Sequence, residues 1–218
     1  MSAMTPTIFR AYDVRGTYPD QLNRGVVEAL GQAIGTYAKQ QGQSTVVTAR
    51  DGRLSGPDLQ DALNQGLIQA GIDVIDVGMV PTPVLYFAAL TLGTGSGVMV
   101  TGSHNPPDYN GYKLKSSLGG PMIPAQIAEV EALIPDHPKS AVMPMSEAKE
   151  KGLIKVVDLE QMYIDHVEAN FDMDLIRNSG IKLAYDAMYG AGQNAVKRLL
   201  PDSVFLNCDV NPSFRGQA

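Results

Sequence analysis

The sequence predicts an α/β fold with a largely parallel core sheet, followed by the start of a second α/β unit. Short apolar runs rich in β-branched residues alternate with segments whose apolar residues recur at helical spacing. The alternation begins near residue 23 and begins again near residue 153. Because strands alternate with helices, the connections favour parallel strands joined by right-handed crossovers.

In the first unit, helices and strands are expected to alternate from a helix at its start to a helix at its end. The expected elements lie at residues 23–41, 45–49, 55–70, 73–78, 83–92, 97–100 and 125–134. Ser55 and Asp58 have the spacing of a capping box at the start of the second helix, and Pro57 lies in its first turn. Gly71 is expected to end that helix.

The boundary between the two units is expected where helical and strand patterns lapse. Residues 137–145 contain two prolines and are expected to form a loop that closes the first unit. We therefore expect a first domain at 1–138, a linker at 139–152 and a partial second domain at 153–218.

The second unit repeats the α/β rhythm over a shorter length. Its expected elements are a strand at 153–158, a helix at 159–171, a strand at 181–188, a helix ending at 200 and a strand at 204–209. The turn Tyr189-Gly190-Ala191-Gly192 lacks both the P-loop lysine and the full dinucleotide fingerprint. We interpret it as a strand-to-helix turn without a direct function.

Composition excludes several classes of protein. Hydrophobic residues make up 44% of the chain, which predicts a folded core, and the net charge is −6. That charge argues against a general partner of nucleic acid or of an anionic membrane, since both need a basic face. Cys208 is the only cysteine, so no internal disulfide is possible, which fits a reducing compartment.

Neither a leader nor a membrane span is expected. The first residues, MSAMTPTIFRAYD, lack a basic segment followed by an apolar core. Residues 77–100 carry no charged side chain, but prolines and glycines interrupt them, which favours two buried elements joined by turns. We expect a soluble, cytoplasmic protein.

The segment VTGSHNPPDYNGYK, residues 100–113, is the strongest candidate for a functional site. Ser103 follows the expected strand at 97–100 by three residues, and ligands of open α/β sheets bind beyond the carboxyl ends of strands. Adjacent side chains usually diverge, so His104 is not expected to reach Ser103 as the base of a hydrolase dyad, and the G-x-S-x-G pattern is absent.

A serine that carries a phosphoryl group fits this segment better than a hydrolytic nucleophile. Phosphoserine adds nearly two negative charges and needs cationic donors, which Arg15, His104 and Lys113 could supply. An ordinary loop is the alternative that these residue types leave open. In that case Arg15 forms an ion pair with Asp13 or Asp51, His104 caps a turn, and Lys113 is a solvated strand residue.

Several segments resemble the α-D-phosphohexomutases, and the serine loop is closest to that of the bacterial phosphomannomutase/phosphoglucomutase group. The resembling segments, in chain order, are IFRAYDVRG (8–16), TARDGRLSGPDL (48–59), VGMVPTPVLYFA (77–88), TGSHNPPDYNGYK (101–113) and NPSFRGQA (211–218). The phosphoglucosamine mutases resemble the chain less, because they tend to have Ser-Ala where it has Thr101-Gly102. The resemblance implies a three-layer α/β/α domain with a mixed, mostly parallel sheet, followed by the start of a second similar α/β domain.

The resemblance also implies a reaction. Ser103 would be a phosphoserine that exchanges its phosphoryl group with a hexose phosphate, mannose or glucose, interconverting the 6-phosphate and the 1-phosphate through a hexose 1,6-bisphosphate. Lys113 would be the general acid/base, and Arg15 and His104 would support the phosphoryl group. Tyr12 would line the pocket mouth, with Arg15 and Lys113 contacting substrate. Mg²⁺ would bind a phosphoserine oxygen of Ser103 and carboxylates.

The chain departs from the family in what it lacks. Family members have four domains, and the chain resembles the first and the start of the second. It contains no Asp-x-Asp-x-Asp run to complete the metal site. We therefore expect a truncated N-terminal fragment with little turnover, in which Asp51 and Arg53 buttress the serine loop. A non-catalytic phosphosugar-binding protein and a phosphohydrolase are the alternatives, and the oligomeric state is left open.

Overall fold

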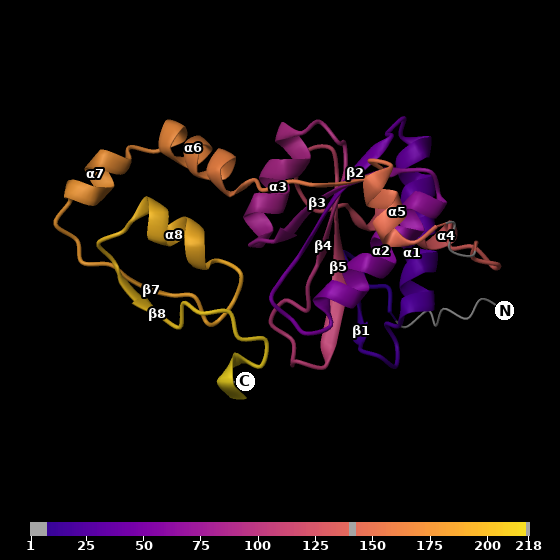
Figure 1. The fold of residues 1–218 in the computed structure, drawn as a ribbon, viewed down its shortest axis with the longest axis horizontal. Coiled ribbons are helices and arrows are strands. Elements are labelled where there is room, and N and C mark those ends of the chain that lie inside the picture. Colours follow the sequence, from indigo (N-terminus) through magenta and orange to yellow (C-terminus); the bar gives the residue numbers. More distant parts are fainter. Residues whose placement is uncertain (1–7, 140–142, 217–218) are drawn as a thin grey trace.

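The computed structural model describes residues 8–139 and 143–216 of the chain. Within these ranges the chain forms a larger α/β unit and a smaller unit that lies beside it (Figure 1). The expectation that the first residues do not form a leader peptide concerns in part residues 1–7. These residues lie outside the described part of the chain.

The larger unit is built on a six-stranded sheet with the order β1-β5-β4-β2-β3-β6. Its strands are β1 (Val14–Thr17), β2 (Thr45–Arg50), β3 (Asp73–Met79), β4 (Gly97–Val100), β5 (Tyr109–Lys115) and β6 (Ile154–Val156). The pairs β2–β3, β2–β4 and β3–β6 are parallel, whereas β5 is antiparallel to both β4 and β1. The prediction of a mixed, mostly parallel sheet is confirmed.

Helices cover both faces of this sheet and make three layers (Figure 1). The helices of the larger unit are α1 (Arg24–Gln40), α2 (Gly56–Gln69), α3 (Thr82–Thr91), α4 (Pro124–Ala132) and α5 (Met145–Glu150). Helices α1 and α2 pack together on one face, and α3 lies on the other. Strand β2 shows the alternation directly, because Val46 belongs to the apolar cluster under α1 and α2 and Val47 to the cluster under α3.

Helices α1 and α2 approach each other closely through two glycines. A Cβ on Gly66 would lie 2.2 Å from the backbone oxygen of Glu28 and 2.8 Å from the Cα of Gly31. Only glycine at these positions lets the backbones come so near. The N-terminus of α1 is fixed by Asn23, whose side-chain oxygen accepts a hydrogen bond from the backbone of Val26 at 3.2 Å.

The capping box expected at Ser55 and Asp58 does not form, so that prediction was wrong. Ser55 has helical backbone angles, φ −74° and ψ −12°, and its side chain makes no capping bond. A capping side chain needs an extended backbone to reach the first turn. The Ser55 hydroxyl instead accepts a hydrogen bond from Asn110 on β5, and Pro57 lies in the first turn as expected.

The strand expected to open the second unit belongs to the first sheet, which corrects the predicted assignment of residues 153–158. Strand β6 pairs in parallel with β3, with Ile154 opposite Val74. Ile154 is buried in the main apolar cluster of the larger unit, and this burial draws the strand onto the first sheet. Within the predicted loop at 137–145, Met145 already begins α5, and residues 140–142 lie outside the described part of the chain.

The smaller unit contains a two-stranded parallel sheet of β7 and β8. Its elements are α6 (Glu160–Asn170), α7 (Met173–Asn178), β7 (Ala184–Asp186), α8 (Gln193–Leu199), β8 (Val204–Leu206) and the short 3₁₀ helix η1 (Phe214–Gly216). Helix α6 contacts α3 of the larger unit, where the Phe87 ring meets Tyr163 and His166. The predicted strand–turn–helix after residue 181 is confirmed by β7 and α8.

The uncharged stretch at 77–100 is divided among β3, α3 and β4. Among the described residues, no helix combines the length and the apolar character that crossing a membrane requires.

Candidate active site

Ser103 lies just beyond the carboxyl end of β4, where the sequence placed it. Strand β4 ends at Val100, and the backbone N–H of Thr101 donates to the oxygen of Gly111 on β5. The antiparallel strand β5 thus returns beside the serine loop, with Lys113 opposite Met99. Strand β1 pairs with β5 in turn and sets Arg15 opposite Gly111.

The guanidinium of Arg53 holds the serine loop by its backbone. It donates to the carbonyl oxygens of Pro106 and Tyr109 at 2.6 and 2.9 Å, and to those of Ser103 and Asn105 at 3.2 and 2.5 Å. Arg53 is only 4% exposed. Burial lowers the pKa of Arg53, and the nearby Asp51 carboxylate acts in the opposite direction.

Asp51 supports the same loop from its start. One of its carboxylate oxygens accepts from the hydroxyl of Thr101 at 2.7 Å and from the backbone N–H of Gly102 at 3.3 Å. The Thr101 hydroxyl in turn accepts from the backbone N–H of Ser103 at 2.9 Å. The other carboxylate oxygen of Asp51 accepts from the backbone of Arg53 at 3.0 Å. The prediction that Asp51 and Arg53 buttress the loop is confirmed.

Ser103 and His104 are closer than the sequence suggested. The hydroxyl oxygen of Ser103 lies 3.3 Å from Nδ1 of His104, so the expectation that these adjacent side chains diverge was wrong. The physical reason is that Ser103 has a left-handed backbone, with φ +54°, so the extended geometry in which adjacent side chains point to opposite sides does not apply there. Both side chains are exposed, and among the described residues no carboxylate accepts a hydrogen bond from the His104 ring.

Arg15 and Lys113 meet at a single carboxylate. The Oδ2 atom of Asp13 accepts from Nη2 of Arg15 at 2.7 Å and from Nζ of Lys113 at 3.1 Å. Of the two ion pairs considered for Arg15, the one with Asp13 forms. Among the described residues, no hydrogen bond joins Ser103 to either cation, and the register leaves two strand spacings, roughly 10 Å, between the backbones of Arg15 and the serine loop.

A cavity of about 280 Å³ opens beside the serine loop. Its walls include Arg53, Ser103 and His104 and the loop residues that follow them, together with Met188, Tyr189 and Phe214 of the smaller unit. The cavity therefore lies between the two units. Tyr12, predicted at the pocket mouth, is 63% exposed and is not among the lining residues.

The second-unit residues of this wall were missed by the sequence analysis. Tyr189 was assigned to a turn without a direct function, yet its side chain borders the cavity and the Arg215 guanidinium lies 5.2 Å from its ring. Met188, Tyr189 and Phe214 all have positive φ. Backbone strain of this kind clusters at functional sites but is not visible in residue types alone.

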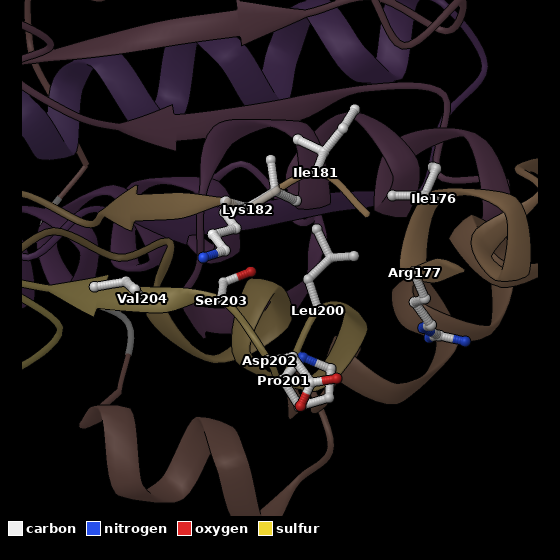
Figure 2. Close-up of a pocket in the computed structure, with 10 residues that line it drawn as sticks. Ile176, Arg177, Ile181, Lys182, Leu200, Pro201, Asp202, Ser203 and Val204 are labelled. Carbon is white, nitrogen blue, oxygen red and sulfur yellow. The ribbon is translucent and has the colours of Figure 1, made fainter. Parts of the chain in front are cut away.

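A second hollow of about 280 Å³ lies wholly within the smaller unit (Figure 2). Its walls are mainly apolar and come from α7 and from the segments that flank β7 and β8, with Ile176, Ile181 and Leu200 among them. None of the predicted site residues lines it. Of the predicted site residues, Ser103 and His104 line the cavity between the two units instead.

Lys115 is a buried cation that the sequence did not single out. It is 1% exposed, and its Nζ donates to the Tyr86 hydroxyl at 2.8 Å and lies 4.1 Å from the Tyr86 ring centre. Burial, and next the positive charge of Lys113, lower the pKa of Lys115 to about 8. The signal that could have found it is its position two residues after Lys113 on the same strand face.

The described residues do not make a complete magnesium site. Nowhere in residues 8–139 and 143–216 do three or more His, Cys, Asp or Glu side chains gather as metal ligands would. Asp51, the carboxylate bonded to the serine loop, already accepts hydrogen bonds with both oxygens. A Mg²⁺ ion bound at phosphorylated Ser103 would need carboxylates from elsewhere.

Comparison with known proteins gives the family. The model described as "Phosphoglucomutase/phosphomannomutase, alpha/beta/alpha domain I" matches residues 6–140, and the corresponding domain II model matches residues 161–218. The chain belongs to the phosphoglucomutase/phosphomannomutase family. The resemblance drawn from the serine loop is thereby confirmed, and the two family models leave residues 141–160 outside both matches.

Individual family members support the assignment. A phosphoglucomutase of Neisseria gonorrhoeae is 37% identical over 219 aligned positions, which cover 98% of this chain and 45% of that protein. A phosphomannomutase/phosphoglucomutase of Pseudomonas aeruginosa is 55% identical over 117 positions, covering 52% of this chain and 25% of that protein.

The fold agrees with solved structures of the family. The crystal structure of a phosphoglucomutase/phosphomannomutase family protein from Burkholderia thailandensis matches with a TM-score of 0.79 and 37% identity, covering 98% of this chain and 46% of that one. The Neisseria gonorrhoeae and Burkholderia thailandensis proteins match nearly all of this chain, and the chain spans slightly less than half the length of each.

Proposed function

We propose that the protein is a phosphohexomutase whose Ser103 carries the phosphoryl group between hexose 6-phosphate and hexose 1-phosphate, with mannose or glucose as the sugar. The observation that carries the proposal is an exposed serine hydroxyl on a backbone-clamped loop, at the edge of a cavity, in a chain of this family. The relatives are named for acting on phosphoglucose and phosphomannose, which supports a phosphorylated hexose as the substrate.

The clamp suits phosphoryl transfer because that reaction depends on positioning and on charge stabilisation. In the first transfer, the bond between phosphorus and the Ser103 oxygen breaks while a bond to a sugar hydroxyl oxygen forms. In the second transfer, the other sugar–phosphate bond of the bisphosphate breaks, the bond to the Ser103 oxygen forms again, and the proton movements described next run in reverse. The sugar hydroxyl gives up its proton, for which Lys113 in its neutral amine form is the proposed acceptor, becoming the ammonium that pairs with Asp13. The Ser103 oxygen takes up a proton, and Nδ1 of His104, at 3.3 Å, is the neighbour placed to supply it.

Arg15 is proposed to balance the negative charge of the phosphoryl group. Its side chain is partly exposed beside Lys113, and a guanidinium matches phosphate oxygens with two donors. Mg²⁺ and a hexose 1,6-bisphosphate stay predictions. The bisphosphate is the intermediate that the two transfers require, and the metal would neutralise phosphoryl charge. A role for Tyr12 at the pocket mouth likewise stays a prediction.

Intact-mass spectrometry tests the proposal. The chain is incubated with a hexose 1,6-bisphosphate and Mg²⁺, and we expect a mass gain of one phosphate. Ser103→Ala should abolish the gain, whereas Ser117→Ala, a change at another exposed serine, should keep it. Absence of phosphate on wild-type Ser103, with sugar phosphate still bound, would favour a non-catalytic binding protein.

A phosphohydrolase is the second candidate, and the Ser103–His104 contact is the observation that favours it. Phosphorus NMR of hexose 1-phosphate incubated with the chain separates the two. Appearance of hexose 6-phosphate supports the mutase. Release of inorganic phosphate without isomerisation supports the hydrolase. Phosphorylated Ser103 without either product would show that this chain carries the phosphoryl group but does not complete the isomerisation; it covers 45% of the length of the Neisseria gonorrhoeae phosphoglucomutase.

A further inference from the structure

A buried carboxylate directly before β1, that of Asp13, takes no part in the phosphoryl transfer proposed above. Asp13 is 7% exposed, and one of its oxygens accepts from both Arg15 and Lys113. The two cations that the proposed reaction uses are therefore joined through a single atom. The side chains of Arg15 and Lys113 remain 26% and 29% exposed, so both are still partly accessible to solvent.

The backbone around Asp13 fixes that atom in place. The residue lies in a tight bend closed by a bridge between Phe9 and Val14, and its own backbone oxygen accepts from the N–H of Arg10 at 2.8 Å. Immediately after it, β1 begins and pairs with β5 in a register that sets Val14 opposite Tyr112. The same register brings Asp13 level with Lys113.

Sharing one acceptor restricts both cations more than two separate partners would. Long lysine and arginine side chains lose considerable rotamer freedom when held, and a surface ion pair alone rarely holds them. Here the acceptor is buried and its backbone is anchored, so the acceptor cannot follow the cations. A reacting group displaced by about 1 Å can cost a rate factor of about 100.

We propose that Asp13 is a positioning residue that holds the Arg15 guanidinium and the Lys113 ammonium in fixed relative places beside the serine loop. This role deepens the proposed phosphoryl transfer and rests on it for its chemical purpose. Asp13 itself contacts neither substrate nor phosphoryl group in this scheme.

The first test measures side-chain motion and needs no activity. NMR relaxation of the Lys113 ammonium and the Arg15 guanidinium, assigned with Lys113→Met and Arg15→Lys, is compared in wild type and Asp13→Asn. We expect both groups to become more mobile in Asp13→Asn. Asp61→Asn, which removes a carboxylate from a surface pair with Arg24, should leave them unchanged. Unchanged mobility in a folded Asp13→Asn variant would overturn the proposal.

The second test measures transfer to Ser103 in a single turnover with hexose 1,6-bisphosphate. We expect Asp13→Asn to lower the rate at saturating bisphosphate by about 10- to 100-fold, with a smaller change in the half-saturating concentration. In a background that lacks both cations, Arg15→Met with Lys113→Met, the same change should have less than about a 2-fold effect on that rate, because Asp13 acts through the two residues that it holds. An equal loss in both backgrounds would show a merely structural role.

A third variant covers the case in which Asp13→Asn does not fold. Asp13→Glu keeps the charge but moves the acceptor by one methylene, so positioning predicts greater mobility of Lys113 and a lower saturating rate at a near-wild-type urea midpoint. Wild-type mobility in Asp13→Glu would contradict the proposal. If wild-type Ser103 is never phosphorylated, the proposed function fails, and the mobility measurements still decide whether Asp13 positions the two cations.

Discussion

Nη2 of Arg53 donates to the backbone oxygen of Ser103 at 3.2 Å. A residue in the loop that follows β2 therefore holds the backbone of the proposed phosphoryl carrier. The same guanidinium binds three further carbonyl oxygens of the loop. A planar group with five donors can satisfy several acceptors of one curved backbone at once. The Arg53 side chain thus helps to hold Ser103 in its left-handed conformation, in addition to the contacts within the loop itself.

Replacing Arg53 by lysine should release the loop. Lysine has three donors on a flexible stem and cannot reproduce the fork, so buried carbonyl oxygens lose partners. We expect Arg53→Lys to lower the free energy of unfolding by about 2 kcal/mol. Urea denaturation measures this, and phosphorylation of Ser103 by hexose 1,6-bisphosphate should slow at least 10-fold, as expected for a displaced reacting group.

Arg50→Lys is the matched control for that change. Arg50 makes one bond of 3.3 Å to the backbone of Asp51, so its replacement should cost less than about 1 kcal/mol. Equal losses in the two variants would argue against a special role for the Arg53 clamp.

Gly102 and Arg53 should behave as a coupled pair. A Cβ at position 102 would lie 2.3 Å from the central carbon of the Arg53 guanidinium, so Gly102→Ala must displace the clamp. We expect Gly102→Ala to destabilise the chain by about 2 kcal/mol. In an Arg53→Ala background the same substitution should cost much less, because nothing remains to displace.

A double-mutant cycle in urea measures this coupling. Gly120→Ala serves as the control, since a Cβ there has no heavy atom within 4 Å. Additive losses for Gly102→Ala and Arg53→Ala would show that the two residues are independent.

The central strands and helices were predictable because their residues follow simple local patterns. Strand β2 is a short continuous run that is buried on both faces, as Val46 and Val47 show, and helix α2 has apolar residues at spacings of three to four, as the burial of Leu59 and Leu63 confirms. Strands β1 and β5 were not predicted as elements. Strand β1 has four residues, one of them Gly16, and β5 alternates apolar Tyr112 and Leu114 with lysines only over its last four residues, so neither pattern is long enough to identify a strand.

The individual residues of the candidate site could be predicted from the sequence, but the contacts between residues from distant segments could not. The serine loop and the neighbouring cations could be named from residue types and motif resemblance. The shared carboxylate of Asp13 depends on the register of β1 against β5, which no local pattern specifies. The wall formed by Met188 and Tyr189 depends on how the smaller unit lies against the larger one.

Helix packing gives a prediction that is independent of the site. Gly66→Ala would place a Cβ 2.2 Å from the backbone oxygen of Glu28, and backbone cannot move aside as a flexible side chain can. We expect a loss of about 3 kcal/mol in the free energy of unfolding. Gly25→Ala, also in a helix, has its nearest neighbour at 3.6 Å and should stabilise the chain by about 0.5 kcal/mol. Thermal unfolding of the two variants should shift in opposite directions.

Lys115 should make stability depend on pH in the alkaline range. Its pKa is lowered to about 8 by burial and then by the charge of Lys113, whereas in the unfolded chain it is near the ordinary value of 10.5. Between these values the unfolded state binds more protons than the folded state, so the contribution of Lys115 to stability rises with pH. Below about pH 8 the buried group is charged in both states, and the cost of burying that charge is fully present.

Lys115→Met removes this titration while keeping a long, flexible side chain in the same space. We expect the stability of the variant relative to wild type to fall by about 2 kcal/mol between pH 7 and pH 9.5, because only wild type gains stability there. Urea denaturation at both pH values measures the difference, and titrations common to both proteins cancel. Lys151→Met, at an exposed pair with Glu147, should show no such trend. A difference between Lys115→Met and wild type that stays constant with pH would mean that Lys115 keeps its proton throughout this range despite its burial.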